Sequence, residues 1–241
     1  MKTLRKFSAL IAKFADARLS PLLLRLFTPD VYWMCGIGVF GFSAFFLMQR
    51  FGLIEFWGGF ASLIWLLLLM ALGTRPELLR SMLDDINDKF LLKFAGGLLS
   101  GILLYGVFWL ARYVQHLILP EWGDHLRSVY RFGLGASELR IMLTIGFLIG
   151  PAEELFWRGF VQDFFTEAEG PWKGFFIGVA LYVIAHLVTL NPMLIGAAVI
   201  AGGYWALLYR FFKSVTLNIA SHVVFDLLAF VILPFNSLGG F

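Results

Sequence analysis

The chain has 241 residues, of which 60% are apolar and only 15% are charged, and its mean hydropathy is +0.82. Soluble globular domains carry about 45–50% apolar and about 25% charged residues, so this composition excludes a soluble fold. The formal net charge is only +3, and we expect the lipid bilayer, and no nucleic acid, as the partner of this surface.

Residues 1–30 form a basic, amphipathic segment. Leu4, Phe7, Ile11 and Phe14 recur at helical spacing, with basic residues on the other face. This pattern predicts a helix that lies in the interface of an anionic membrane, with an ordinary packing helix as the alternative. A short apolar core with a small-residue cleavage site is missing, so we expect no cleaved signal peptide.

Seven apolar stretches that follow are long enough to cross about 30 Å of hydrocarbon as helices. Together they predict a single membrane domain over residues 31–241, an all-α polytopic bundle of about seven transmembrane spans. The stretches are 31–49, 53–73, 94–116, 139–165, 174–190, 193–212 and 215–235.

The basic residues are distributed unequally between the two ends of these spans. If successive spans alternate in direction, thirteen Lys and Arg residues lie on the side of the N-terminus and five on the other side. Cytoplasmic loops carry the excess of positive charge. We therefore expect a multi-pass protein of the cell inner or plasma membrane, with a cytoplasmic N-terminus and the C-terminus outside.

The fourth stretch contains Glu153, Glu154 and Arg158. An ionised side chain at the centre of a membrane helix costs about 2.5–3.5 kcal/mol, so such groups indicate a function or a compensating partner. Glu154 and Arg158 are four residues apart and are expected to form an internal ion pair. Glu153 is rotated by about 100° from that face and is therefore the candidate for a reactive carboxylate.

Further polar residues occur in the fifth and seventh stretches: Tyr182, His186, Asn218, His222 and Asp226. Counted from the predicted cytoplasmic ends, Glu153, His186 and His222 lie at depths of about 12 to 18 Å, at 1.5 Å per residue. The side chains can therefore converge on one site inside the membrane. The same count favours a site that opens to the cytoplasm.

Three motifs in this order resemble those of the CAAX protease and bacteriocin-processing family of intramembrane endopeptidases. Glu153, Glu154 and Arg158 match its Glu-Glu-x-x-x-Arg motif. His186 is similar to the histidine of its second motif, and His222 with Asp226 to its His-x-x-x-Asn/Asp motif. The resemblance covers residues 139–235, which we take as the catalytic core.

Two positions depart from the family pattern. Tyr182 stands where the second motif usually has Phe, and Asp226 stands where the prenyl-protein proteases of the family carry Asn. An ionised Asp cannot donate a hydrogen bond, so Asp226 is expected to orient His222 or to stay protonated.

The resemblance implies hydrolysis of a peptide bond, near a substrate terminus or within a membrane segment, by a Glu-activated water. The implied catalytic residues are Glu153, His186, His222 and Asp226. Glu153 would accept a proton from water, and His186 would orient or share that water. His222, helped by Asn218 or another neighbouring donor, would donate to the oxyanion. The residues expected to support them are Glu154, Arg158, Asn218 and Tyr182.

Three alternatives remain open at this stage. Glu153, His186, His222 and Asp226 are also an acceptable ligand set for zinc, although metal-free catalysis is favoured because a His-Glu-x-x-His helix is lacking. The polar cluster would also suit a non-catalytic scaffold or immunity protein, or an ion-coupled transporter. The expected substrate is a peptide or protein, lipidated or not, and the sequence does not choose between them.

Overall fold

The computed structural model describes residues 30–133 and 135–235, and every regular element in these ranges is a helix. This confirms the all-α helical membrane fold. The interfacial helix predicted within residues 1–30 lies outside the described residues.

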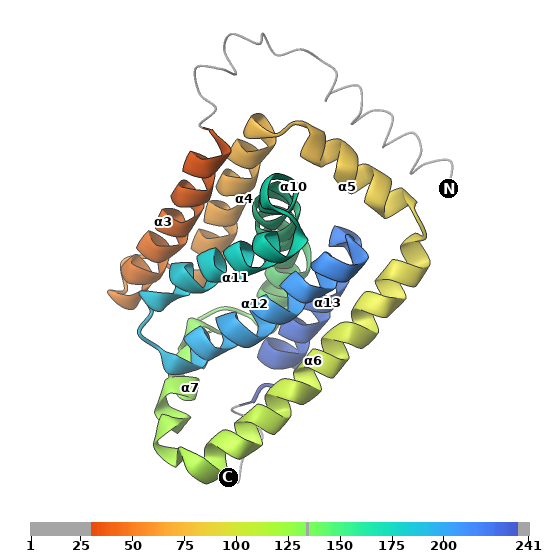
Figure 1. The fold of residues 1–241 in the computed structure, drawn as a ribbon. Helices are drawn as coiled ribbons and strands as arrows, with labels where there is room; N and C mark the ends of the chain where they lie inside the picture. Colours follow the sequence, from red (N-terminus) through yellow and green to blue (C-terminus); the bar gives the residue numbers. More distant parts are fainter. Residues whose placement is uncertain (1–29, 134, 236–241) are drawn as a thin grey trace.

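Helices α3 (Val31–Arg50) and α4 (Phe56–Thr74) lie side by side along one side of the molecule (Figure 1). The Glu55 side chain caps α4, because its carboxylate accepts from the backbone N–H groups of the first turn at 3.0 and 2.8 Å. The same carboxylate pairs with Arg140 at 2.9 Å. The start of α4 is thereby tied to a helix that comes much later in the chain.

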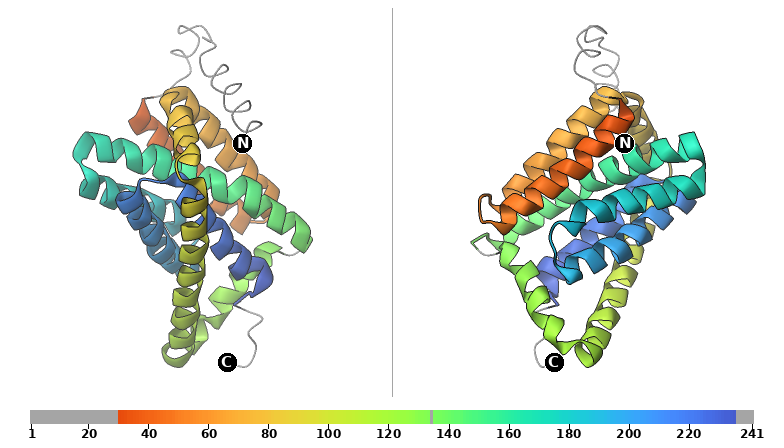
Figure 2. Two further views of the ribbon diagram at one scale, coloured as in Figure 1. Left: turned by 90° about the vertical axis from the view of Figure 1, so that its right-hand side faces the viewer. Right: turned by 60° about the vertical axis from the view of Figure 1, so that its left-hand side comes forward.

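Two connections mark the two ends of the bundle. Helix α5 (Glu77–Asn87) crosses one end, between α4 and the long helix α6 (Phe90–Ile118), which forms the opposite edge of the molecule (Figures 1 and 2). At the other end the chain passes through the short helices η1 (Pro120–Trp122), α7 (Gly123–Tyr130) and η2 (Arg131–Gly133). We call these the α5 end and the α7 end.

Residues 138–169 form one helical rod in which α-helical and π-helical turns alternate. Its elements are α8 (Glu138–Leu143), η3 (Thr144–Ile149), α9 (Gly150–Glu154), η4 (Leu155–Gln162) and α10 (Asp163–Glu169), where η3 and η4 are π-helical. Pro151 has no N–H for the ordinary helical bond, which accounts for the irregular turn before it. The two π-helical segments flank the five-residue α9, and such widened turns occur frequently at functional sites.

The chain ends in three helices that lie across the centre of the bundle. They are α11 (Pro171–Leu187), α12 (Pro192–Phe212) and α13 (Val215–Leu227), which continues into the π-helical η5 (Leu228–Ile232). Helix α11 packs against α3 and α12, and α13 packs against α6. Gly170 makes the tight turn into α11 with a φ of +90°, a conformation that favours glycine.

Five helices of the described residues are long and apolar enough to cross a membrane: α3, α4, α6, α12 and the 18-residue rod of α13 with η5. All seven predicted stretches coincide with helical segments. The two that fall outside the five are the 138–169 rod, which the π-helical turns divide, and α11, which has 17 residues. Large apolar side chains are exposed along these helices, which suits a surface solvated by lipid.

Glycines set the close approach of α6 and α13. A Cβ atom at Gly97 would collide with the carbonyl of Leu217, and one at Gly101 with the carbonyl of Ser221. Small residues on α6 therefore allow the two helix backbones to approach closely. Gly150 of α9 likewise packs against Val223 of α13, whereas Gly146 faces open space.

Asp85 of α5 fixes the start of α13. Its Oδ2 accepts from the backbone N–H of Thr216 at 2.7 Å and from Ser214 Oγ at 3.2 Å, while Oδ1 pairs with Lys93 Nζ at 2.8 Å. Burial raises the pKa of Asp85, but the bonds from Lys93, Thr216 and Ser214 outweigh it, so that the pKa lies below its usual value. This anchor sets the height at which Asn218 and His222 reach the bundle centre.

Candidate active site

The polar residues predicted from the sequence meet in the interior, and Glu154 lies at their centre. Its side chain is fully buried. Oε1 accepts from Arg158 Nη1 at 2.8 Å and from His222 Nδ1 at 2.7 Å, and Oε2 accepts from Asn218 Nδ2 at 3.0 Å. The predicted Glu154–Arg158 ion pair is confirmed, and the same carboxylate also holds the imidazole from α13.

Arg158 is enclosed on its remaining sides. Its Nη2 donates to the carbonyl of Gly202 on α12 at 2.9 Å. The guanidinium lies 4.9 Å from the ring centre of Tyr182 and 5.6 Å from that of Trp205. Aromatic faces and a carbonyl compensate the loss of hydration of a buried cation. Tyr182 therefore has a packing role that a Phe would also fill.

His222 is held with one ring nitrogen turned toward Glu153. Because a carboxylate only accepts, the bond to Glu154 puts a proton on Nδ1. Nε2 then lies 3.6 Å from Glu153 Oε2 and 3.3 Å from Asp226 Oδ2. The ring stacks on Trp205 with centroids 3.8 Å apart. Two carboxyl groups thus share one imidazole nitrogen, which suits a proton held between them.

His186 approaches the same space from α11. Its Nδ1 lies 2.8 Å from the carbonyl of Tyr182, so Nδ1 donates and Nε2 of the neutral ring is left as an acceptor. The ring packs between those of Phe46 and Tyr182, with ring centroids 5.0 and 4.6 Å from its own. A histidine fixed in this way can accept a hydrogen bond from a water in the pocket.

These groups line a pocket of about 130 Å³. A few water molecules fill such a volume, at about 30 Å³ each in the liquid. Glu153, His186, His222 and Asp226 all reach it. Glu153 Oε1 is buried and has no hydrogen-bond partner among the described residues. An orphan carboxylate oxygen beside a cavity is where an ordered water binds.

Asn218 contacts Glu154 and the backbone of α12. Its Nδ2 group donates to Glu154 Oε2 and to the carbonyl of Trp205, at 3.0 and 2.8 Å. Both amide protons are therefore engaged, and the predicted donation to an oxyanion does not fit this geometry. Asn218 instead positions Glu154, from one turn before His222.

The pocket lies toward the α7 end, and the predicted opening toward the basic α5 end is wrong. Its walls include Phe46 near the end of α3, Trp57 at the start of α4, Phe132 of η2 and Leu194 at the start of α12. Toward the α5 end the bundle is filled by Arg158 and by further residues of η4. One of them, Gln162, is buried and donates to the carbonyl of Ala206 at 2.9 Å. The number of residues between a site residue and the end of its helix gives a depth. It does not show at which end of the bundle other side chains block the pocket.

The four residues considered as zinc ligands do not form a metal-binding cluster here. Within residues 30–133 and 135–235, no group of three or more His, Cys, Asp and Glu side chains is placed to hold a metal ion. Both nitrogens of His222 already face carboxylates of the chain. We therefore derive no step through a metal.

Helices outside the motifs supply half of the pocket wall. Phe46 and Phe60 close one side, and Trp57 adds an indole whose Nε1 is buried without a hydrogen-bond partner among the described residues. Trp205 of α12 also lines the pocket. The motif spacing could not identify these residues, because aromatic side chains are frequent throughout the sequence and carry no charge that would mark them.

The fold and site define an all-helical integral membrane protein with a buried glutamate, histidine and aspartate cluster beside a small polar pocket. Residues 135–228 match the family model described as type II CAAX prenyl endopeptidase Rce1-like. This match confirms the resemblance to the CAAX protease family that the motifs predicted. The members of that family are generally proteases. The matched segment contains every motif residue. No curated protein and no solved structure matches the chain.

Proposed function

We propose that this protein is an intramembrane endopeptidase in which Glu153 activates the attacking water. The observation that carries the proposal is the position of Glu153: one oxygen is buried without a partner beside the pocket, and the other lies 3.6 Å from His222. A carboxylate used only for packing would have both oxygens paired, as Glu154 has.

The chemistry follows from the placement of each group. Glu153 accepts a proton from a water that also donates to His186 Nε2, and the resulting hydroxide oxygen attacks the peptide carbonyl carbon. His222 Nε2–H donates to the carbonyl oxygen as it becomes negative. Glu153 then gives the proton to the amine that leaves when the C–N bond breaks. Asp226, 3.3 Å from Nε2, keeps a proton on His222 while the pocket is empty.

The substrate is a peptide or protein, lipidated or not, that enters from the α7 end of the bundle. The excess of basic residues toward the α5 end supports a cytoplasmic position of that end, in a cell with an inner or plasma membrane. Access to the site is then from the outer face. Thiol labelling of Ser81→Cys on α5 and Glu121→Cys on η1 in intact cells measures this orientation, because the native Cys35 is buried.

The activity test uses the purified protein in detergent with a mixed panel of lipidated and unlipidated peptides. Wild type is compared with Glu153→Gln and with Glu169→Gln. Glu169 is an exposed control whose one ion pair among the described residues is with Lys173. We expect cleavage by wild type and by the control, no cleavage by Glu153→Gln, and no effect of a chelator. Loss of activity with the chelator and recovery with zinc would replace the mechanism by a metal-dependent one. Equal cleavage by Glu153→Gln would contradict the proposal.

A further inference from the structure

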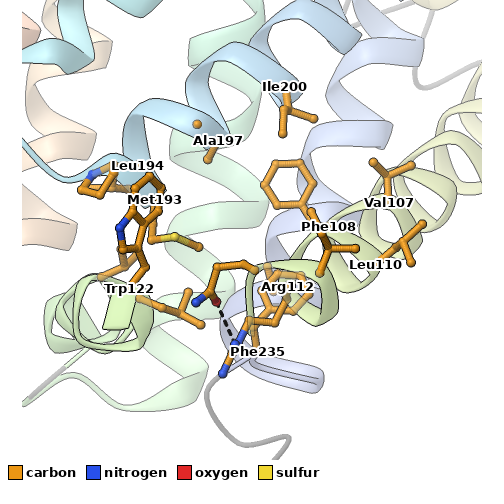
Figure 3. A pocket seen from close by; sticks show the side chains of 18 of the residues that line it. Val107, Phe108, Leu110, Arg112, Trp122, Met193, Leu194, Ala197, Ile200 and Phe235 are labelled. Carbon is orange, nitrogen blue, oxygen red and sulfur yellow. Dashed lines mark hydrogen bonds between the residues drawn. The ribbon is translucent and has the colours of Figure 1, made fainter. Parts of the chain in front are cut away.

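A second and larger cavity lies beside the candidate active site, with a volume of about 580 Å³. It is bounded by the C-terminal half of α6, by α7, by the first half of α12 and by the end of α13 with η5. Its lining is almost entirely apolar and includes Val107, Leu110, Met193, Ile200 and Phe235 (Figure 3). The volume is within the range of about 300–1,000 Å³ that holds a small organic ligand.

The cavity borders the bilayer. Leu110 and Val114 of α6 and Ile200 of α12 line the cavity and are exposed on the surface of the bundle. An apolar space open between two membrane helices is filled by hydrocarbon, since most of this lining offers water no polar partner. The lining therefore selects an acyl chain as the occupant.

One cation stands in this apolar wall. Arg112 lies six residues before the end of α6, about 9 Å along the helix axis and close to the depth of the lipid headgroups. Figure 3 shows its guanidinium among the cavity side chains, bonded to the neutral Gln115 at 2.8 Å. Arg112 Nε is buried without a hydrogen-bond partner, and Arg112 has no ion pair, within the described residues.

We propose that this cavity binds an anionic phospholipid of the bilayer, with an acyl chain against α6 and α12 and the phosphate on Arg112. A phosphate oxygen can accept a hydrogen bond from Nε, and its negative charge can form an ion pair with the guanidinium. Gln115 cannot do either, because its oxygen already accepts from Nη1 and its amide donates to the carbonyl of Leu119. The lipid would bind whether or not Glu153 is catalytic.

The bound lipid would form part of the wall of the active site. Leu194, Ala197 and Phe230 line both cavities. An acyl chain on one side of these three side chains holds them in place on the other. The lipid site and the substrate pocket thus share a partition that is one side chain thick.

The test measures lipid binding to the delipidated protein by native mass spectrometry, with phosphatidylglycerol and phosphatidylcholine of the same chains. We expect wild type to retain phosphatidylglycerol about fivefold better, the contribution of one arginine near a membrane surface. Arg112→Gln should lose that preference. The matched control is Arg127→Gln, since Arg127 is exposed on α7 and, among the described residues, pairs only with Asp124. An equal preference in Arg112→Gln and wild type would overturn the proposal.

A second variant tests the cavity rather than the charge. Gly196 lines the cavity, and a Cβ atom there meets nothing within 4 Å, so Gly196→Leu should fill the space and displace the lipid. Gly203→Leu is the control on the same helix, because Gly203 also faces open space but lies outside the cavity. Retention of the lipid by a folded Gly196→Leu would place it elsewhere. Competition by inorganic phosphate alone would show a free-anion site and would also overturn the proposal.

Discussion

The two neighbouring carboxylates of α9 have opposite surroundings. Every oxygen of Glu154 is bonded: to an arginine of η4, and to a histidine and an amide of α13. Glu153, the next residue, has one oxygen without a partner among the described residues and the other 3.6 Å from His222. One residue of helical rotation thus separates a carboxylate that holds the helices together from one that faces a cavity. Both side chains are buried, so burial does not distinguish them. The oxygen without a hydrogen-bond partner does, and it marks Glu153 as the candidate for the reactive acid.

The largest expected effect is the loss of activity in Glu153→Gln. The amide has the same shape but cannot accept the proton of the water, and a general base contributes about 10²–10⁴-fold to the rate. Stability should not fall, because no hydrogen bond to Glu153 is broken. Peptide cleavage and the melting temperature in detergent check both parts. A large loss of stability would instead show that Glu153 is structural, and the contrast with Glu154 would fail.

The converse substitution, Glu154→Ala, should unfold or strongly destabilise the protein. It leaves Arg158 buried at 2% exposure without its carboxylate, and breaking a buried ion pair from one side costs about 3–5 kcal/mol. It also frees His222 Nδ1 and Asn218 Nδ2. Thermal unfolding measures the cost, and Glu154→Gln, which keeps the acceptor for Arg158 but not the charge, should lose less. A variant that is stable yet inactive would move Glu154 into the chemistry.

A smaller effect is expected at Trp57, which lines the pocket but lies outside the residues matched by the family model. Trp57→Phe removes an indole N–H that is buried without a partner among the described residues and that lies at the pocket. If this donor binds a substrate carbonyl, kcat/KM should fall by about five- to tenfold, the value of one hydrogen bond. The melting temperature should not fall, since an unsatisfied donor has been removed. An unchanged kcat/KM would exclude the indole from substrate binding.

The same contrast explains what the sequence could and could not predict. The charged and histidine residues at intervals of four predicted the Glu154–Arg158 pair and the approach of His222, because helical geometry alone relates such positions. The aromatic wall from α3 and α4 and the end at which the pocket lies were missed or wrong. They depend on how α4 and α12 pack beside the motif helices, which the spacing within any one helix does not encode.

The smallest expected effect is at Asp85, which is far from the pocket but sets the position of α13. Asp85→Asn weakens the cap on Thr216 and the pair with Lys93, and the loss of a helix cap costs about 0.5–2 kcal/mol. The pKa of Asp85 is lowered by folding, so its carboxylate stabilises the fold above its unfolded pKa of about 3.9, and this contribution is lost as the pH falls through the folded value. The melting-temperature difference between wild type and Asp85→Asn should therefore be constant near neutral pH and shrink below about pH 4. A difference that persists in acid would show that the geometry of the cap, rather than its charge, holds His222 at the height of Glu153.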